Sequence, residues 1–186
     1  MPNKRVTIAV AAFVLFAAMI VLSNYLLQHF GLLGPIPGTS WLVPAGTFCA
    51  AITWPTRDVL SRVSGPKWGP WVGLAAVLVG AGIAWIISPT LAVASAVAYL
   101  CSEGTDWGLF WLLGGQRAEG LAYLRPLSIS VVVASFVDSV VFLNLAGIPW
   151  STAGPGLLFA KWGTVLVIGL PLSYRLRDVV PVAAAA

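Results

Sequence analysis

The chain has 186 residues, of which 59% are hydrophobic and only 9% are charged. A soluble globular domain carries about 25% charged residues, so this composition excludes a chain that covers its whole surface with water-facing groups. The formal net charge of +4 is small, and no basic run indicates a nucleic-acid partner. We therefore expect one compact domain over residues 1–186, embedded in a lipid bilayer.

Six apolar segments follow one another along the chain, each long enough to cross the hydrocarbon core as a helix. We expect transmembrane helices over residues 6–28, 41–59, 70–87, 91–113, 127–145 and 156–174. The segments between them are rich in Gly and Pro, as helix ends and loops are. The first segment is too long for a signal peptide, and no small-residue cleavage site follows it. The prediction is an all-α membrane protein, a compact bundle of six transmembrane helices.

Lys and Arg are distributed unequally between the connections of these six predicted helices. Nine fall on one side, whereas the opposite connections, residues 31–40, 88–90 and 146–155, contain none. The nine are Lys4, Arg5, Arg57, Arg62, Lys67, Arg117, Arg125, Arg175 and Arg177. Because basic residues are retained on the cytoplasmic side, we expect both termini in the cytoplasm and a multi-pass protein of the inner membrane.

Small residues repeat every four positions in the third segment, at Ala76, Gly80 and Ala84. This spacing lets two helices approach closely. Packing within one chain is the preferred interpretation, and a homodimer stays open. Cys49 and Cys101 have no paired spacing, so the sequence predicts neither a disulfide framework nor a metal site.

Ionisable residues interrupt segments that are otherwise apolar. A charge at the centre of a bilayer costs about 2.5–3.5 kcal/mol on insertion scales, so such residues are candidates for function. In the predicted topology, Glu103 and Asp138 lie near mid-membrane and Lys161 lies in the outer third, while Asp106 shares a helix face with Glu103. A buried ammonium needs a partner, so we expect Lys161 to pair with Asp138 or Glu103.

Polar and aromatic residues near these charges complete a predicted substrate site. Its members are Asn24, Trp54, Tyr99, Glu103, Asp106, Asp138 and Lys161. We interpret Asp58, with Arg57 and Arg62, as an ion network at the cytoplasmic end of the second helix. With three carboxylates and one Lys in the interior, at least one carboxylate lacks a Lys partner and is available to a proton or to a ligand rich in donors.

Motifs typical of enzymes are missing from the sequence. It contains no P-loop, no HExxH, no GxSxG and no Cys/His metal spacing. The sequence therefore predicts a protein that is not an enzyme, with no catalytic residues, no metal and no cofactor. A helical bundle with internal charges fits a transporter or a binding component better.

Several short sequence elements follow one another along the chain in a characteristic order. They are Ser23-Asn24, Asp58 followed by Arg62 and Gly65, Ala98-Tyr99 followed by Glu103 and Asp106, Ser135 followed by Asp138, and Lys161 followed by Pro171 and Tyr174. In this order they resemble the vitamin uptake transporter (VUT) family, the queuosine-precursor transporters, over nearly the whole chain. The chain departs from the family in its short loops and in Glu103, where family members often have Gln.

The resemblance implies a six-helix importer of a 7-deazaguanine base, such as 7-cyano-7-deazaguanine or 7-aminomethyl-7-deazaguanine. Such a base presents a ring N–H and an exocyclic amine side by side, and one carboxylate can accept both. We expect Glu103 and Asp138 on this donor edge and Asn24 and Lys161 on the acceptor edge of the base. The individual role of each of these two carboxylates stays open.

Two other classes compete with this interpretation. A substrate-binding subunit of an energy-coupling-factor vitamin transporter would have a similar bundle and would need an ATPase partner. Those subunits often dock through Ala-x-x-x-Ala in the first helix, a spacing that the first segment lacks. A structural or regulatory membrane protein would have little use for buried charges. Coupling to a proton or to sodium stays open.

Overall fold

The computed structural model describes residues 4–115, 122, 124–169 and 171. In this part of the chain there are five α-helices, one π-helix and a pair of two-residue strands. The helices are α1 (Lys4–Phe30), α2 (Thr47–Trp85), α3 (Pro89–Leu112), α4 (Leu124–Leu145) and α5 (Trp150–Thr164), continued by the π-helix η3 (Val165–Gly169). The described residues are therefore predominantly helical, as the apolar segments predict.

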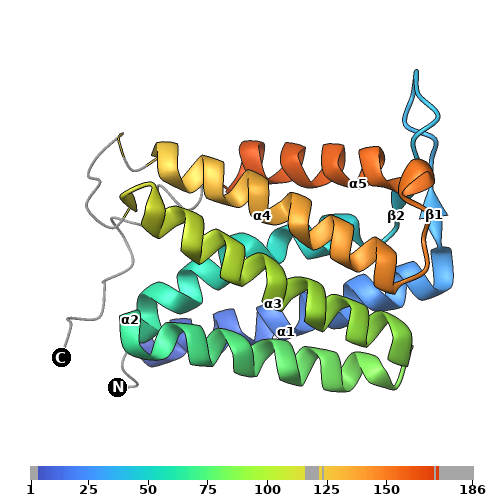
Figure 1. The fold of residues 1–186 in the computed structure, drawn as a ribbon. Helices are drawn as coiled ribbons and strands as arrows, with labels where there is room; N and C mark the ends of the chain where they lie inside the picture. Colours follow the sequence, from blue (N-terminus) through green and yellow to red (C-terminus); the bar gives the residue numbers. More distant parts are fainter. Residues whose placement is uncertain (1–3, 116–121, 123, 170, 172–186) are drawn as a thin grey trace.

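Helix α2 consists of two arms that meet at Gly65. Gly65 has φ 82° and ψ 170°, a backbone conformation that residues with a Cβ rarely adopt. Figure 1 shows both arms, residues 47–64 and 66–85, extending from this bend toward the same end of the molecule, so that the chain runs in opposite directions along them. These arms correspond to the second and third predicted helices. The gap predicted between them, residues 60–69, is wrong, because one glycine reverses the chain while helix continues on both sides.

The helical segments lie side by side, and consecutive segments run in opposite directions (Figure 1). Helix α1 packs most extensively on α2, and α3 packs most extensively on α4. The start of α1, the Gly65 bend and the end of α3 lie at one end of the bundle, which we call the Gly65 end. The end of α1, the two strands and the start of α5 lie at the other end, which we call the strand end.

The two strands at the strand end were not predicted. Strand β1 (Leu32–Leu33) pairs antiparallel with β2 (Val43–Pro44), so that Leu33 lies opposite Val43. The predicted start of the second helix at residue 41 is therefore wrong: Val43 and Pro44 belong to a strand, and α2 begins at Thr47. Helix α5 also differs from the prediction, because it begins at Trp150 and keeps Pro155 inside it.

Three helices of the described part are long and apolar enough to cross a membrane, judged by length and composition: Lys4–Phe30, Lys67–Trp85 and Leu124–Leu145. The other helical segments are short or carry charged side chains along their length. The first arm of α2 carries Arg57, Asp58 and Arg62, α3 carries Glu103 and Asp106, and α5 has only 15 residues. Large apolar side chains are exposed on the outside of the bundle, including Val14 (60%) and Leu112 (72%).

The stripe of small residues lies inside the bundle. Ala76 and Ala84 are fully buried, and a Cβ built on Gly80 would lie 3.1 Å from the carbonyl oxygen of Ala17 on α1. The second arm of α2 therefore packs closely on α1 through this stripe. The preferred interpretation, packing within one chain, is confirmed.

Candidate substrate site

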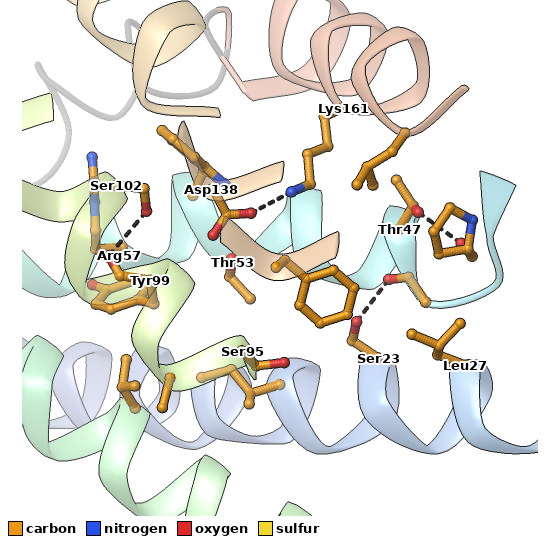
Figure 2. Close-up of a pocket in the computed structure, with 18 residues that line it drawn as sticks. Ser23, Leu27, Thr47, Thr53, Arg57, Ser95, Tyr99, Ser102, Asp138 and Lys161 are labelled. Atoms are coloured by element: carbon orange, nitrogen blue, oxygen red, sulfur yellow. Dashed lines mark hydrogen bonds and ion pairs between the residues drawn. The ribbon is translucent and has the colours of Figure 1, made fainter. Parts of the chain in front are cut away.

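A cavity lies in the middle of the bundle between α1, α2, α3, α4 and α5 (Figure 2). About 80 Å³ of it is open to the centres of water-sized molecules. Its wall combines apolar side chains such as Val77 and Phe142 with hydroxyls and three charged residues, Arg57, Asp138 and Lys161. An apolar wall with a few convergent polar groups is typical of a small-molecule site. We call this space the central cavity.

Lys161 and Asp138 point toward one another at the central cavity (Figure 2). The ammonium group of Lys161 on α5 donates to the carboxylate of Asp138 on α4, and it also lies 3.2 Å from the Ser139 hydroxyl oxygen. The predicted pairing of Lys161 is thus confirmed, and Asp138 is the partner. The Lys161 side chain is 3% exposed, whereas Asp138 keeps 19%. Asp138 can therefore accept from a ligand while it holds Lys161.

A layer of serines behind this ion pair joins α4 to α5. Ser135 and Ser139 are fully buried on α4. The indole N–H of Trp162, next to Lys161 in sequence, donates to the Ser135 hydroxyl oxygen at 2.7 Å. These bonds hold the end of α5 against α4, so the Lys161 ammonium stays directed at Asp138.

Arg57 pairs with Asp58, as predicted, but its predicted position at a helix end is wrong. It was expected at a cytoplasmic helix end, but it is only 8% exposed and lies inside the bundle on the first arm of α2. Its guanidinium bonds to Glu103 Oε2 at 2.6 Å and Asp106 Oδ2 at 2.7 Å on α3, and to Asp58 Oδ1 at 3.0 Å on its own helix. The cause is electrostatic, because carboxylates inside the bundle need a cation and, among the described residues, Lys161 pairs with Asp138 and no other carboxylate.

A sequence signal for Arg57 existed. The charge count of the interior leaves Glu103 and Asp106 without a Lys partner, and Arg57 lies within the apolar segment predicted over residues 41–59. Guanidinium is the cation best suited to hold several carboxylates at once. As predicted, the interior holds carboxylates without a Lys partner: neither Glu103 nor Asp106 pairs with Lys161 among the described residues, and Arg57 engages one oxygen of each. The other oxygen of Asp106, Oδ1, is buried and has no hydrogen-bond partner in the described part of the chain.

Glu103 and Asp106 line a second cavity, which extends from Arg57 toward the Gly65 end. About 320 Å³ of this second cavity is open to the centres of water-sized molecules. Trp107 and Phe110 form part of its wall. The predicted convergence of Glu103 with Asp138 on one ligand edge is therefore not what the structure shows, because the two carboxylates border different cavities.

Of the remaining predicted site residues, two line the central cavity and one lies behind its wall. Trp54 and Tyr99 line the central cavity, and the Trp54 ring centroid lies 5.4 Å from the guanidinium carbon of Arg57. Asn24 is 2% exposed and outside the lining residues. Its side-chain oxygen accepts from the Ser95 hydroxyl at 2.9 Å, so Asn24 ties α1 to α3. It thereby positions a wall residue, Ser95.

Sequence reasoning missed the hydroxyl groups of the cavity wall. They belong to Ser23, Thr47, Thr53, Ser95 and Ser102. Ser and Thr are ordinary in membrane helices, where their hydroxyls bond to the backbone of their own helix, so they give no specific signal. Only the packing of the helices reveals which of them face a common space.

At the strand end of the cavity, α1 and the residue before α2 are in tight contact. The Ser23 hydroxyl donates to the Gly46 carbonyl oxygen at 3.0 Å, and a Cβ on Gly46 would lie 2.1 Å from the Ser23 carbonyl oxygen. Only glycine fits this approach. Figure 2 shows Ser23 and Thr47 at this end of the cavity and Arg57 with Tyr99 at the other.

Among the described residues, no group of three or more His, Cys, Asp or Glu side chains is arranged to hold a metal ion. Comparisons of the chain with protein-family models, with curated proteins and with solved structures found no match. The site must therefore be interpreted from its own chemistry.

Proposed function

We propose that this protein is a membrane transporter that binds a small, planar, polar base in the central cavity. The observation that carries the proposal is the Lys161–Asp138 ion pair, buried in a helical bundle and facing a cavity with a mixed polar and apolar wall. Buried ion pairs are costly to form and add little stability on their own. In membrane proteins they mark substrate and ion pathways.

The cavity chemistry favours a ligand with donors on one edge and an acceptor on another. Asp138 accepts from the donor edge, such as an adjacent ring N–H and amine. Lys161 and Arg57 supply donors to a carbonyl oxygen. Trp54 and Tyr99 provide aromatic surface for a flat ring, where stacking contributes about 1–3 kcal/mol per base in nucleic-acid sites. A 7-deazaguanine base, the queuosine-precursor class that the sequence resemblance implies, has all of these features.

We propose that six segments cross the inner membrane: α1, both arms of α2, α3, α4, and α5 with η3. The alternating directions of these segments support this topology. Arg62 and Lys67 flank the bend at the Gly65 end, and the strand-end connections, residues 31–46, 86–88 and 146–149, contain no Lys or Arg. By the positive-inside rule, the Gly65 end and both termini face the cytoplasm.

Binding and transport are tested separately. Calorimetry on the detergent-purified protein would compare 7-cyano-7-deazaguanine, 7-aminomethyl-7-deazaguanine, guanine and adenine. We expect the deazaguanines to bind and adenine not to bind, because adenine lacks the carbonyl acceptor and the adjacent donors. A folded protein that binds none of the four bases would contradict the proposal.

Uptake of a radiolabelled base into liposomes that contain only this protein separates a transporter from its closest rival. A substrate-binding subunit of an energy-coupling-factor transporter would bind the base but would not move it without its ATPase partner. Uptake above empty liposomes supports the transporter, and repeating it across imposed proton and sodium gradients identifies any coupling ion. Tight binding without uptake would favour the subunit.

A further inference from the structure

Arg57 separates the two cavities. Among the described residues it is the one that lines both the central cavity and the second cavity. Tyr99 and Ser102 border the central cavity beside it, and Glu103 and Asp106 border the second cavity. These four residues lie on α3, within about two turns of helix, so the two cavities approach each other at Arg57.

The guanidinium links two helices as well as two cavities. Its bonds to Glu103 and Asp106 join the first arm of α2 to α3, whereas its bonds to Asp58 stay within α2. A guanidinium has five N–H donors, and the four bonds recorded here use four of them. One N–H on Nη1 is not used by these four bonds.

We propose that Arg57, held by Glu103 and Asp106, is the gate through which solute leaves the central cavity toward the Gly65 end. The gate opens when Arg57 releases the two carboxylates of α3. A solute with a carbonyl or anionic oxygen can take the Arg57 donors and compete with these carboxylates, whereas a simple cation would be repelled. The inference rests on the proposed function only for the identity of the solute, because the gate itself is a property of the two cavities.

Cysteine accessibility tests the gate without any solute. The 186-residue chain with Cys49 and Cys101 replaced by Ala provides the background. Ser102→Cys reports on the central cavity beside Arg57, and Ser61→Cys reports on the second cavity. An impermeant thiol reagent is added to either side of vesicles, and Ser61→Cys itself identifies the side that the second cavity faces.

From that side, we expect Ser102→Cys to react much more slowly than Ser61→Cys. Adding Glu103→Gln, which weakens one interhelical bond and keeps the side-chain shape, should speed the reaction of Ser102→Cys about tenfold, the equivalent of about 1.4 kcal/mol. Asp106→Asn should act in the same direction. Asp58→Asn is the comparison variant, because it removes a carboxylate from the same guanidinium and the Arg57–Asp58 bonds lie within α2.

Three results would overturn the gate: equal labelling of Ser102→Cys and Ser61→Cys in the background protein, no acceleration by either α3 substitution, or an equal acceleration by Asp58→Asn. Each variant is checked by its thermal midpoint, so that general unfolding is not mistaken for opening. Base uptake by a protein whose Ser102→Cys is freely labelled would leave the transporter standing and remove the gate. If the labelling is as expected but the protein takes up no base, the gate stands and the transporter proposal fails.

Discussion

Lys161 donates to Asp138 from a side chain that is only 3% exposed, while the Asp138 carboxylate remains partly open to the central cavity. One partner of the pair is therefore buried and the other is accessible. This asymmetry lets a ligand bind the carboxylate without displacing the ammonium. We therefore expect substitution of Asp138 to affect ligand binding and substitution of Lys161 to affect stability.

Asp138→Asn should weaken binding of a guanine-like base by at least about thirtyfold, since losing one partner of a buried charged hydrogen bond costs about 2–5 kcal/mol. Calorimetry in detergent measures the change. Asn144→Ala is the control, because Asn144 lies on the same helix, is exposed and bonds only to its own backbone at Val140 among the described residues. Unchanged affinity in Asp138→Asn would make Asp138 a structural residue and move the ligand elsewhere.

Lys161→Met should destabilise the protein by up to about 3–5 kcal/mol, because the Asp138 carboxylate, which is only 19% exposed, loses its cation. Thermal unfolding of the purified protein measures the effect. The double variant Lys161→Met with Asp138→Asn should recover most of the stability, since no uncompensated charge remains. If Lys161 also donates to the ligand, this double variant folds without binding. An unchanged thermal midpoint for Lys161→Met alone would show that the ion pair does not stabilise the fold.

Gly80→Val should destabilise the bundle by about 1–3 kcal/mol, the usual cost of overpacking a close contact. The new side chain would meet the Ala17 carbonyl oxygen and the Ile20 side chain on α1, both about 3.1 Å from the Cβ position. Gly82→Val is the matched control, because a Cβ on Gly82 has nothing within 4 Å. Equal destabilisation of both variants would contradict the close packing of α1 on α2.

The proposed topology predicts opposite labelling of two exposed positions. In a background without Cys49 and Cys101, Lys67→Cys should react only with reagent on the cytoplasmic side, and Ser40→Cys only with reagent on the other side. Both residues are exposed. Lys67 follows the Gly65 bend and Ser40 lies between β1 and β2, and these two elements lie at opposite ends of the bundle. Labelling of both positions from one side would exclude the six-span arrangement.

The helices were predictable because their signal is local. Apolar runs of sufficient length predict helix in a membrane protein, since no other local structure satisfies the backbone in lipid. The boundaries were less predictable. The start of α2 depends on the pairing of Val43 and Pro44 with β1, and the reversal at Gly65 depends on one residue with positive φ.

Pairing of Lys161 with a carboxylate was determined by the sequence alone, because a buried ammonium must be neutralised and few acidic groups lie at its depth. Tertiary structure decided which acid it takes. Helices α4 and α5 bring Asp138 to Lys161, while α2 brings Arg57 to Glu103 and Asp106. The division of the predicted site into two cavities follows from that choice. Charge balance is a property of the whole interior, but the assignment of each partner depends on which helix faces are packed together, and no local pattern records that.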